Sequence, residues 1–301
     1  PVHAGKIALA PDVDAPHALA AIAADCLAQI GGNAEPLREG RDGEFLHQLR
    51  VGVRRARSLL KLASGEQSAP EIASLDAALR ELGQVFGPAR DWDVFTTGTL
   101  AAIASHLSDP TLRRELGRLR ARATRRRRLH QAQAQTEAGS QRFTCLLLGL
   151  GRYCAGLPLA AADASPAVAL ARVALERSAR RLHKRGKRLR AADAAGRHRA
   201  RVAAKRLRYS AEFFAPLFRH AGATGYIAAL AELQRSLGQL NDLAAATRLL
   251  DELVGTAARS DAGLAHAAGL VRGWIAATSA HELVRMAKTW RDFARAKPFW
   301  N

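Results

Sequence analysis

Apolar residues recur along most of the chain at the three- and four-residue spacing of amphipathic helices. Glycine and proline lie where such helices are expected to end, as at Gly31-Gly32 and Gly87-Pro88. No run of alternating β-branched residues indicates a strand. The chain is therefore expected to be all-α. The predicted helices cover 17–30, 44–63, 71–86, 91–107, 111–135 and 140–155, and then 166–190, 197–219, 224–238, 242–255 and 262–292.

The helical pattern occurs twice. His47 lies 151 residues before His198 (198 − 47 = 151), and the same offset, without a gap, relates many other positions. It takes Arg50 to Arg201, Arg54 to Lys205, Arg57 to Arg208, Leu79 to Leu230 and Asp91 to Asp242. An offset that holds over so long a stretch predicts an internal duplication, with repeats at 18–155 and 169–301 inside one domain, 1–301. We expect two helical bundles of about four main helices each, related by a pseudo-twofold axis.

The helix predicted over 44–63 carries a stripe of cations. At about 100° per residue, one histidine and four cations fall within an arc of roughly 80°. Apolar residues such as Leu49 and Val53 occupy the adjacent arc, and Arg55 stands on the far side. The stripe consists of His47, Arg50, Arg54, Arg57 and Lys61.

The second repeat keeps this design. Glu212 stands at the position of Lys61, so the second stripe is shorter, and Arg206 matches Arg55. The helix before it carries a further basic row, whereas the corresponding helix at 18–30 has no cation. The second stripe is His198, Arg201, Lys205 and Arg208, and the further row is Arg177, Arg180, Lys184 and Lys187.

The total charge agrees with an anionic partner. The chain has 46 Lys and Arg against 27 Asp and Glu, a formal net charge of +19. Such a protein prefers polyanions, among which nucleic acid, an anionic membrane surface and polyphosphate are candidates. No apolar run approaches the ~20 residues that span a bilayer. The three cysteines lack disulfide spacing, so we expect a reducing, cytoplasmic location.

The position of the stripes favours a linear polyanion. A solvated helix face usually lies opposite the core and mixes both charge signs, but these stripes have one sign and adjoin the apolar edge. Two such stripes that face each other across a pseudo-dyad would line a shared basic groove or pore. Guanidinium groups donate paired hydrogen bonds to phosphate oxygens, and a row of them suits a chain with closely spaced charges.

Several motifs carry a family resemblance over nearly the whole chain. "FLHQLRVGVRRARSLLKL" at 45–62 and "RHRARVAAKRLRYSAEFF" at 197–214 resemble the two signature helices of the CHAD domain, the conserved histidine α-helical domain. "GPARDWDV" at 87–94, "GQLNDLAA" at 238–245 and "AKPFW" at 296–300 are also similar to the family. The resemblance implies helical bundles around a basic channel that binds inorganic polyphosphate without catalysis, often at polyphosphate granules. The implied phosphate-facing set is His47, Arg50, Arg54, Arg57, His198, Arg201, Lys205 and Arg208. We expect Lys61, Arg206 and the further row Arg177, Arg180, Lys184 and Lys187 to bind the same polyphosphate.

Members of this family frequently follow a CYTH (triphosphate tunnel) domain. The Glu-x-Glu-x-Lys signature of such a domain does not occur in this sequence. The segment "GKIALAPDVDAPHALA" near the start is typical of a linker. The chain is therefore expected to be the CHAD part of a longer CYTH–CHAD protein.

The acidic residues leave two interpretations open. Asp91, Asp93 and Asp242 follow glycine-containing turns, so they are expected to be helix N-caps. Alternatively, Asp91 and Asp242 hold Arg50 or Arg201 in one rotamer. With Glu44, these acids are the best candidates for an Mg²⁺ site of a polyphosphate-processing enzyme, but their spacing forms no such constellation. We expect no cofactor, no metal and no enzymatic activity.

The densest basic stretch, "RRELGRLRARATRRRRLH" at 113–130, supports a rival function. Its cations lie all around the predicted helix, which favours a solvated face or a non-specific anion patch. Arginine-rich helices also occur in DNA- and RNA-binding proteins. Nucleic-acid binding through 113–130 therefore remains an alternative.

Overall fold

The computed structural model describes residues 1–300 except 41, 64–68, 161–164, 219–221 and 256–260. Within these residues the fold is all-α, as predicted, with an isolated bridge between Asp14 and Pro166. Residues 219 and 301, where a predicted helix and the second repeat end, lie outside the described part. The first half contains α1 (Ala15–Arg38), α2 (Gly43–Ala63), α3 (Pro70–Asp93), the π-helical segment η1 (Val94–Thr99), α4 (Leu100–His106), α5 (Pro110–Ala138) and α6 (Gln141–Gly156).

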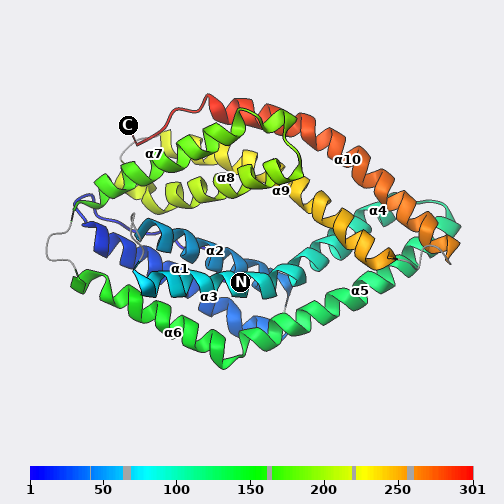
Figure 1. Cartoon of the computed structure of the whole chain (residues 1–301), viewed down its shortest axis with the longest axis horizontal. Coiled ribbons are helices and arrows are strands. Elements are labelled where there is room, and N and C mark those ends of the chain that lie inside the picture. Colours follow the sequence, from blue (N-terminus) through cyan, green and yellow to red (C-terminus); the bar gives the residue numbers. More distant parts are fainter. Residues whose placement is uncertain (41, 64–68, 161–164, 219–221, 256–260, 301) are drawn as a thin grey trace.

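The second half follows the short 3-10 helix η2 (Pro158–Ala160) and begins beside the first half. Ala15 N donates to Ser165 O at 2.9 Å, and Ala167 N donates to Val13 O at 2.9 Å. Figure 1 shows α7 to α10 above α1, α2, α3 and α6. The elements are α7 (Ala167–Gly186), η3 (Leu189–Ala191), α8 (Ala194–Phe214), η4 (Ala215–Leu217), α9 (Gly222–Val254) and α10 (Ala262–Ala294).

Three predicted helix ends were wrong, because glycine and proline lie inside continuous helices. The first helix continues through Gly31 and Gly32 to Arg38, α3 passes Pro88 and continues through η1 into α4, and α9 passes Gly238. Pro88 costs a helix about 3 kcal/mol. Phe86, Ala89 and Trp92 around it are nevertheless fully buried, and their burial outweighs that cost.

Gly32 has a local reason to lie within α1. A Cβ atom at this position would lie 2.6 Å from a methyl carbon of Val2, so the glycine lets the N-terminal segment cross the helix closely. Asn33 fixes that crossing, since its side chain donates to Val2 O at 2.8 Å and accepts from Val2 N at 3.1 Å. The N-terminal residues are thereby held on α1.

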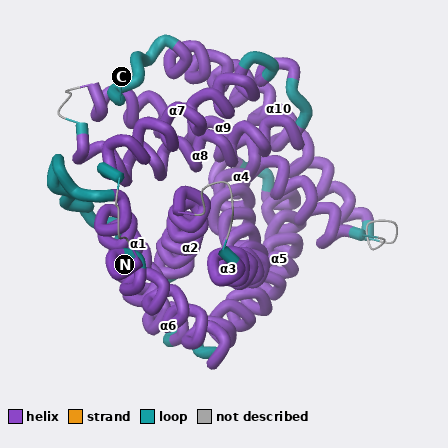
Figure 2. The backbone as a smooth tube through the Cα atoms, turned by 60° about the vertical axis from the view of Figure 1, so that its left-hand side comes forward, coloured by secondary structure: helices purple, strands orange, loops and turns teal. Residues whose placement is uncertain are grey.

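Two hydrophobic cores hold together the helices, whose arrangement Figure 2 shows. In each half the helices pack in the same order: α1 on α2, α2 on α3 and α3 on α5, then α7 on α8, α8 on α9 and α9 on α10. The larger core joins these helices with α6. The smaller core lies at the end of the molecule where η1, α4 and the start of α5 meet the last part of α9 and the first part of α10.

Helix α2 is fixed by an apolar face and one buried ion pair. Arg55, which the helical wheel places away from the stripe, is 2% exposed, and its Nη2 lies 2.6 Å from Asp25 Oδ2. It also donates to Gln29 Oε1 at 2.8 Å and lies over the ring of Phe213. With this side of α2 anchored to α1 and α8, the stripe side faces the interior between the two halves.

Candidate functional site

A cavity of about 1160 Å³ lies between the two halves. Helices α2 and α8 form opposite walls, and α3, α9 and the N-terminal residues 3–7 contribute most of the remaining lining, with a few residues from α1, η1 and η4. Every residue predicted on the two stripes lines it, together with Arg206. The set is His47, Arg50, Arg54, Arg57, Lys61, His198, Arg201, Lys205, Arg206 and Arg208.

The central arginines carry buried donors that have no acceptor. Nε and Nη1 of Arg50 and Nε of Arg201 are buried and make no hydrogen bond with the described residues. Arg50 packs against Gly87 of α3, where a Cβ would lie 3.4 Å from its Nη1. A buried donor without a partner costs about 1–3 kcal/mol, and more when it is charged. These donor groups are therefore suited to bind an anion.

Lys205 lies between these arginines and makes no hydrogen bond or ion pair with the described residues. Burial, followed by the charges of Arg54, Arg201 and Arg50, lowers the pKa of Lys205 to about 5. Burial and the charge of Arg54 lower the pKa of Arg50 to about 10, so this guanidinium stays charged at neutral pH. The centre of the cavity thus has an excess of positive charge.

The outer parts of the stripes are partly neutralised. Arg57 donates to both carboxylate oxygens of Asp76, at 2.8 and 3.3 Å, and Arg208 Nε donates to Glu212 Oε1 at 2.6 Å. Arg54 donates only a long bond, 3.4 Å, to the hydroxyl of Tyr209. At the middle of the two stripes, Arg50 and Lys205 therefore have no acceptor among the described residues, and Arg54 and Arg201 have only distant ones, Tyr209 and Asp242.

The two histidines have different surroundings. His47 is half-buried, and burial, followed by the charge of Arg90, lowers its pKa to about 4. His198 is exposed, and its Nδ1 lies 2.8 Å from Asn241 Oδ1. The repeat therefore preserves the position of the histidine in the cavity but not its electrostatic environment.

Comparison with known proteins identifies the family. A family model described as the CHAD domain matches residues 21–251. The chain belongs to the CHAD family. A crystal structure of the CHAD domain from the plant Ricinus communis is 35% identical to this CHAD domain, with a TM-score of 0.83 over 98% of both chains. PptA from Streptomyces chartreusis, 16% identical, shares the fold with a TM-score of 0.70 over 93% of this chain and 100% of its own. A comparison with curated proteins gave no match.

The acidic residues of the CHAD domain are not the helix N-caps that the sequence predicted. Asp91 and Asp93 lie within α3 and Asp242 within α9, because both helices are continuous, so none of the three caps a helix. Asp242 Oδ1 lies 3.9 Å from Arg201 Nη2, whereas Asp91 accepts from Arg248 at 3.3 Å and not from Arg50. Burial raises the pKa of Asp91.

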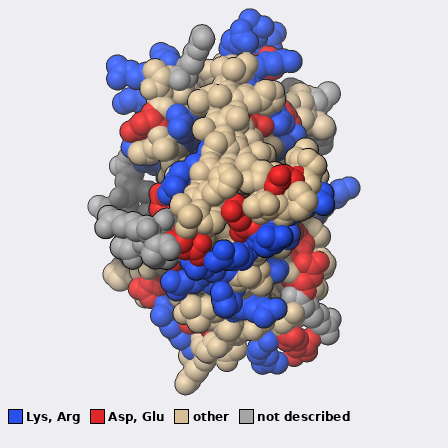
Figure 3. Space-filling view, turned by 90° about the vertical axis from the view of Figure 1, so that its right-hand side faces the viewer, with Lys and Arg blue, Asp and Glu red and all other residues tan. Residues whose placement is uncertain are grey.

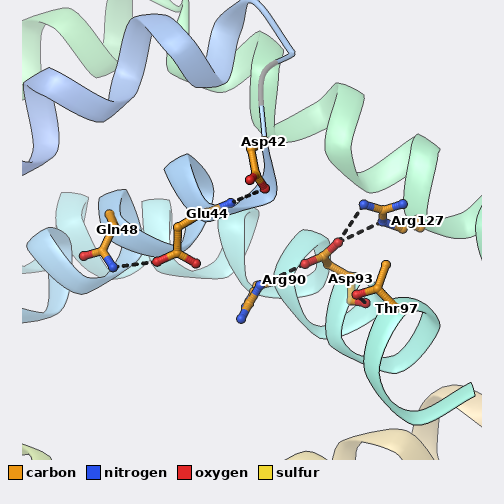
Figure 4. Close-up of polar contacts among 7 residues, drawn as sticks. All are labelled: Asp42, Glu44, Gln48, Arg90, Asp93, Thr97 and Arg127. Carbon is orange, nitrogen blue, oxygen red and sulfur yellow. Dashed lines mark hydrogen bonds and ion pairs between the residues drawn. The ribbon is translucent and has the colours of Figure 1, made fainter. Parts of the chain in front are cut away.

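The acids do not assemble into a metal site in the described part of the chain. No group of three or more His, Cys, Asp or Glu side chains there is placed to hold a metal ion. Glu44 accepts from Gln48 Nε2 at 2.7 Å at the start of α2, apart from Asp93, which binds Arg90 and Arg127 (Figure 4).

The basic row on α7 does not line the cavity. Arg177 and Arg180 line a separate surface pocket with Trp300, and neither Lys184 nor Lys187 lines the cavity. At about 100° per residue the row lies opposite the buried face of α7, which includes Leu175 and Leu182. A row opposite the packing face is a solvated face, so the prediction that it joins the stripes was wrong.

Sequence reasoning missed cavity residues outside the two stripes. His3 and Lys6 come from the N-terminal segment, Arg90 from α3 and Arg235 from α9. Arg90 was missed because Gly87 and Pro88 suggested a turn. On a continuous helix, Arg90 lies beside Asp91 and one turn before Val94, both of which line the cavity.

A second basic surface lies on α5, at the end of the molecule that contains the smaller core. Figure 3 shows Lys and Arg gathered in a belt across this end, with acidic side chains beside it. Arg118 pairs with Asp261 and Arg127 with Asp93, whereas Arg114, Arg125 and Arg128 are exposed and make no ion pair with the described residues. None of the described helices is long and apolar enough to cross a membrane.

Proposed function

We propose that this CHAD domain binds inorganic polyphosphate in the cavity between α2 and α8 and holds it without processing it. One observation carries the proposal: two cationic stripes from different helices line one cavity, and their central guanidinium groups are buried without acceptors. Phosphate oxygens are the acceptors that such groups bind best. The association of the CHAD family with polyphosphate binding supports the same ligand.

The shape of the site favours a thin chain over a duplex. The stripes face each other across the cavity, and α2 also contacts α8 directly. A single phosphate chain can pass between two helices, whereas a nucleic-acid duplex is wider than the space between neighbouring helices. Affinity is expected to be mainly electrostatic and to fall as salt rises, because each neutralised phosphate releases counterions.

A holding role rather than a cleaving role follows from the residues of the site. Phosphoryl transfer generally requires carboxylates that place Mg²⁺ beside the phosphates. Three acids line the cavity, Asp91, Asp242 and Glu212, and each of them pairs with an arginine of the chain. Asp91 and Asp242 lie close enough to interact, but no third acid joins them among the described residues. We further propose that the domain acts in the cytoplasm at polyphosphate granules, with a CYTH domain as a partner.

The test measures binding of labelled long-chain polyphosphate over a series of salt concentrations. The double variant Arg54→Glu, Lys205→Glu is expected to lose binding at 150 mM salt. The matched control, Arg177→Glu with Arg180→Glu on α7, carries the same change in formal charge outside the cavity and should bind within a few-fold of the wild type. Equal losses in the two variants would show that net charge, and not the cavity, binds the ligand. Release of phosphate in the presence of Mg²⁺ would refute the holding role.

The belt on α5 supports a second candidate, binding of nucleic acid on an open surface. Its unpaired arginines lie on a long exposed helix, which a duplex can approach. Charge reversal at Arg114, Arg125 and Arg128 should then abolish duplex DNA binding and spare polyphosphate binding. If the wild type binds duplex DNA as tightly as polyphosphate at physiological salt, the second candidate replaces the first.

A further inference from the structure

The first half of the cavity contains an arginine that the second half lacks. Arg90 lines the cavity from α3, and its counterpart at the repeat offset is Asn241 (90 + 151 = 241). Asp93, which pairs with Arg90, has Ala244 as its counterpart (93 + 151 = 244). Both members of the pair are therefore specific to the first half.

Asp93 is held rigidly at the junction of three helices (Figure 4). It is 6% exposed, and its Oδ1 accepts from Nε and Nη2 of Arg127 on α5 at 2.9 and 2.8 Å. A Cβ at Gly43, the first residue of α2, would lie 3.3 Å from its Oδ2. Its own carbonyl accepts from Thr97 Oγ1 at 2.8 Å in the π-helical segment. A carboxylate held by so many contacts can orient a partner.

That partner is Arg90. Its Nη1 donates to Asp93 Oδ2 at 2.8 Å, while its Nε and Nη2 groups make no hydrogen bond with the described residues. The side chain is 28% exposed and lines the cavity close enough to His47 to lower the pKa of that histidine. Arg90 thus presents free, oriented donors beside the first stripe.

The second half offers an uncharged arrangement at the same place. His198 bonds the amide of Asn241. The additional arginine of the second half, Arg235, stands at the position of Gln84 (84 + 151 = 235) and is paired with Glu232. Positions that correspond by the repeat offset thus hold an oriented cation, Arg90, in the first half and an amide, Asn241, in the second.

From this geometry we infer that Arg90, positioned by Asp93, is an additional phosphate-contacting residue that makes the His47 side of the cavity the stronger one. The inference rests on the proposed function and adds an asymmetry between the two walls to it. A short chain should bind preferentially along the His47 side. A long chain contacts both walls and should depend less on Arg90.

The chain itself offers matched variants. Arg90→Asn gives the first half the residue of the second, and Asn241→Arg makes the reverse change. We expect Arg90→Asn to weaken binding of tripolyphosphate about tenfold, as for a lost hydrogen bond to a charged group, and binding of long-chain polyphosphate by less. Asn241→Arg should not weaken the binding of tripolyphosphate or of long-chain polyphosphate. Equal affinity of the wild type and Arg90→Asn for tripolyphosphate would overturn the inference.

A double-mutant cycle tests the positioning role of Asp93. Asp93→Asn should weaken tripolyphosphate binding when Arg90 is present and have no further effect in the Arg90→Asn protein. A merely structural role would weaken binding equally in both backgrounds. If Asp93→Asn does not fold, Arg90→Lys replaces it, since a lysine keeps the charge but cannot make the same oriented contacts and should bind less tightly than the wild type.

A measurement without ligand separates the two possible failures. The pKa of His47, followed by NMR, should rise in Arg90→Asn and stay unchanged in Asn241→Arg. If the wild type binds no polyphosphate of any length, the proposed function fails and this inference fails with it. If the wild type binds polyphosphate but Arg90→Asn has the same His47 pKa and the same tripolyphosphate affinity as the wild type, the inference alone fails.

Discussion

Lys205 should couple polyphosphate binding to proton uptake. Its pKa in the empty cavity is about 5, lowered by burial and then by Arg54, Arg201 and Arg50. At pH 7.5 the amine is therefore uncharged, and protonating it costs roughly 3 kcal/mol at about 1.4 kcal/mol per pH unit. A phosphate placed among these groups offsets their repulsion and stabilises the ammonium form. Binding then raises the pKa of Lys205, and one proton enters with the ligand.

The sign of the pH dependence follows from this linkage. Because the bound form holds one more proton between pH 5 and the raised pKa of the complex, affinity should fall as pH rises, up to tenfold per pH unit for each proton. His47, whose pKa is about 4 in the empty cavity, can add a second proton in the same direction. The variant Lys205→Arg stays charged over this pH range, so its binding should take up one proton fewer and its affinity should depend less on pH.

The assay is the dissociation constant of long-chain polyphosphate from pH 6 to 9 at constant ionic strength. Long chains are required because terminal phosphate groups titrate near pH 6 themselves. The slope of log Kd against pH should be steeper in the wild type than in Lys205→Arg by about one. Calorimetry in buffers of different ionisation enthalpy counts the same proton directly. Identical slopes in the two proteins would refute the reasoning.

Three further substitutions test the electrostatics and the packing. Asp76→Asn releases its guanidinium partner on α2 toward the cavity and should tighten polyphosphate binding a few-fold with a steeper salt dependence, measured in the same assay. Asp25→Ala leaves the guanidinium of Arg55 buried without its carboxylate and should lower the free energy of unfolding by about 3–5 kcal/mol in urea titrations. Gly186→Ala places a Cβ 1.8 Å from the ring of Trp290 and should lower stability by about 1–3 kcal/mol, seen as a reduced Tm; an unchanged Tm would show that the ring moves freely.

The stripes were predictable because they depend only on local geometry. Once 44–63 is a helix, residues three and four apart share a face, so His47, Arg50 and Arg54 must lie together whatever surrounds them. What the structure adds is that the two stripes, on the α2 and α8 walls, line the same cavity. The family and the all-α fold followed from the same motifs and are confirmed.

The remaining errors concern features that local sequence does not determine. Glycine and proline end helices only when nothing else compensates, and the burial of Phe86 and Trp92 on either side of Pro88 is a tertiary effect. The row at Arg177 has the same spacing as the stripes, and only the packing of α7 shows that it faces outward. To predict that Arg90 lines the cavity, one would have to know that the helix is continuous and that Asp93 orients the guanidinium group.

The smaller core bears on the origin of the chain. Trp92 and Phe95 of the first half pack there with Leu249 and Val271 of the second, so neither half alone covers these surfaces. A half-length chain would expose them and could bury them only against another copy of itself. If the two halves arose by the duplication predicted from the sequence, an ancestral half-length chain would have had to form a symmetric homodimer with its cavity on the twofold axis. Fusion of the two copies would then have removed the requirement for identical halves and let the two sides of the cavity diverge.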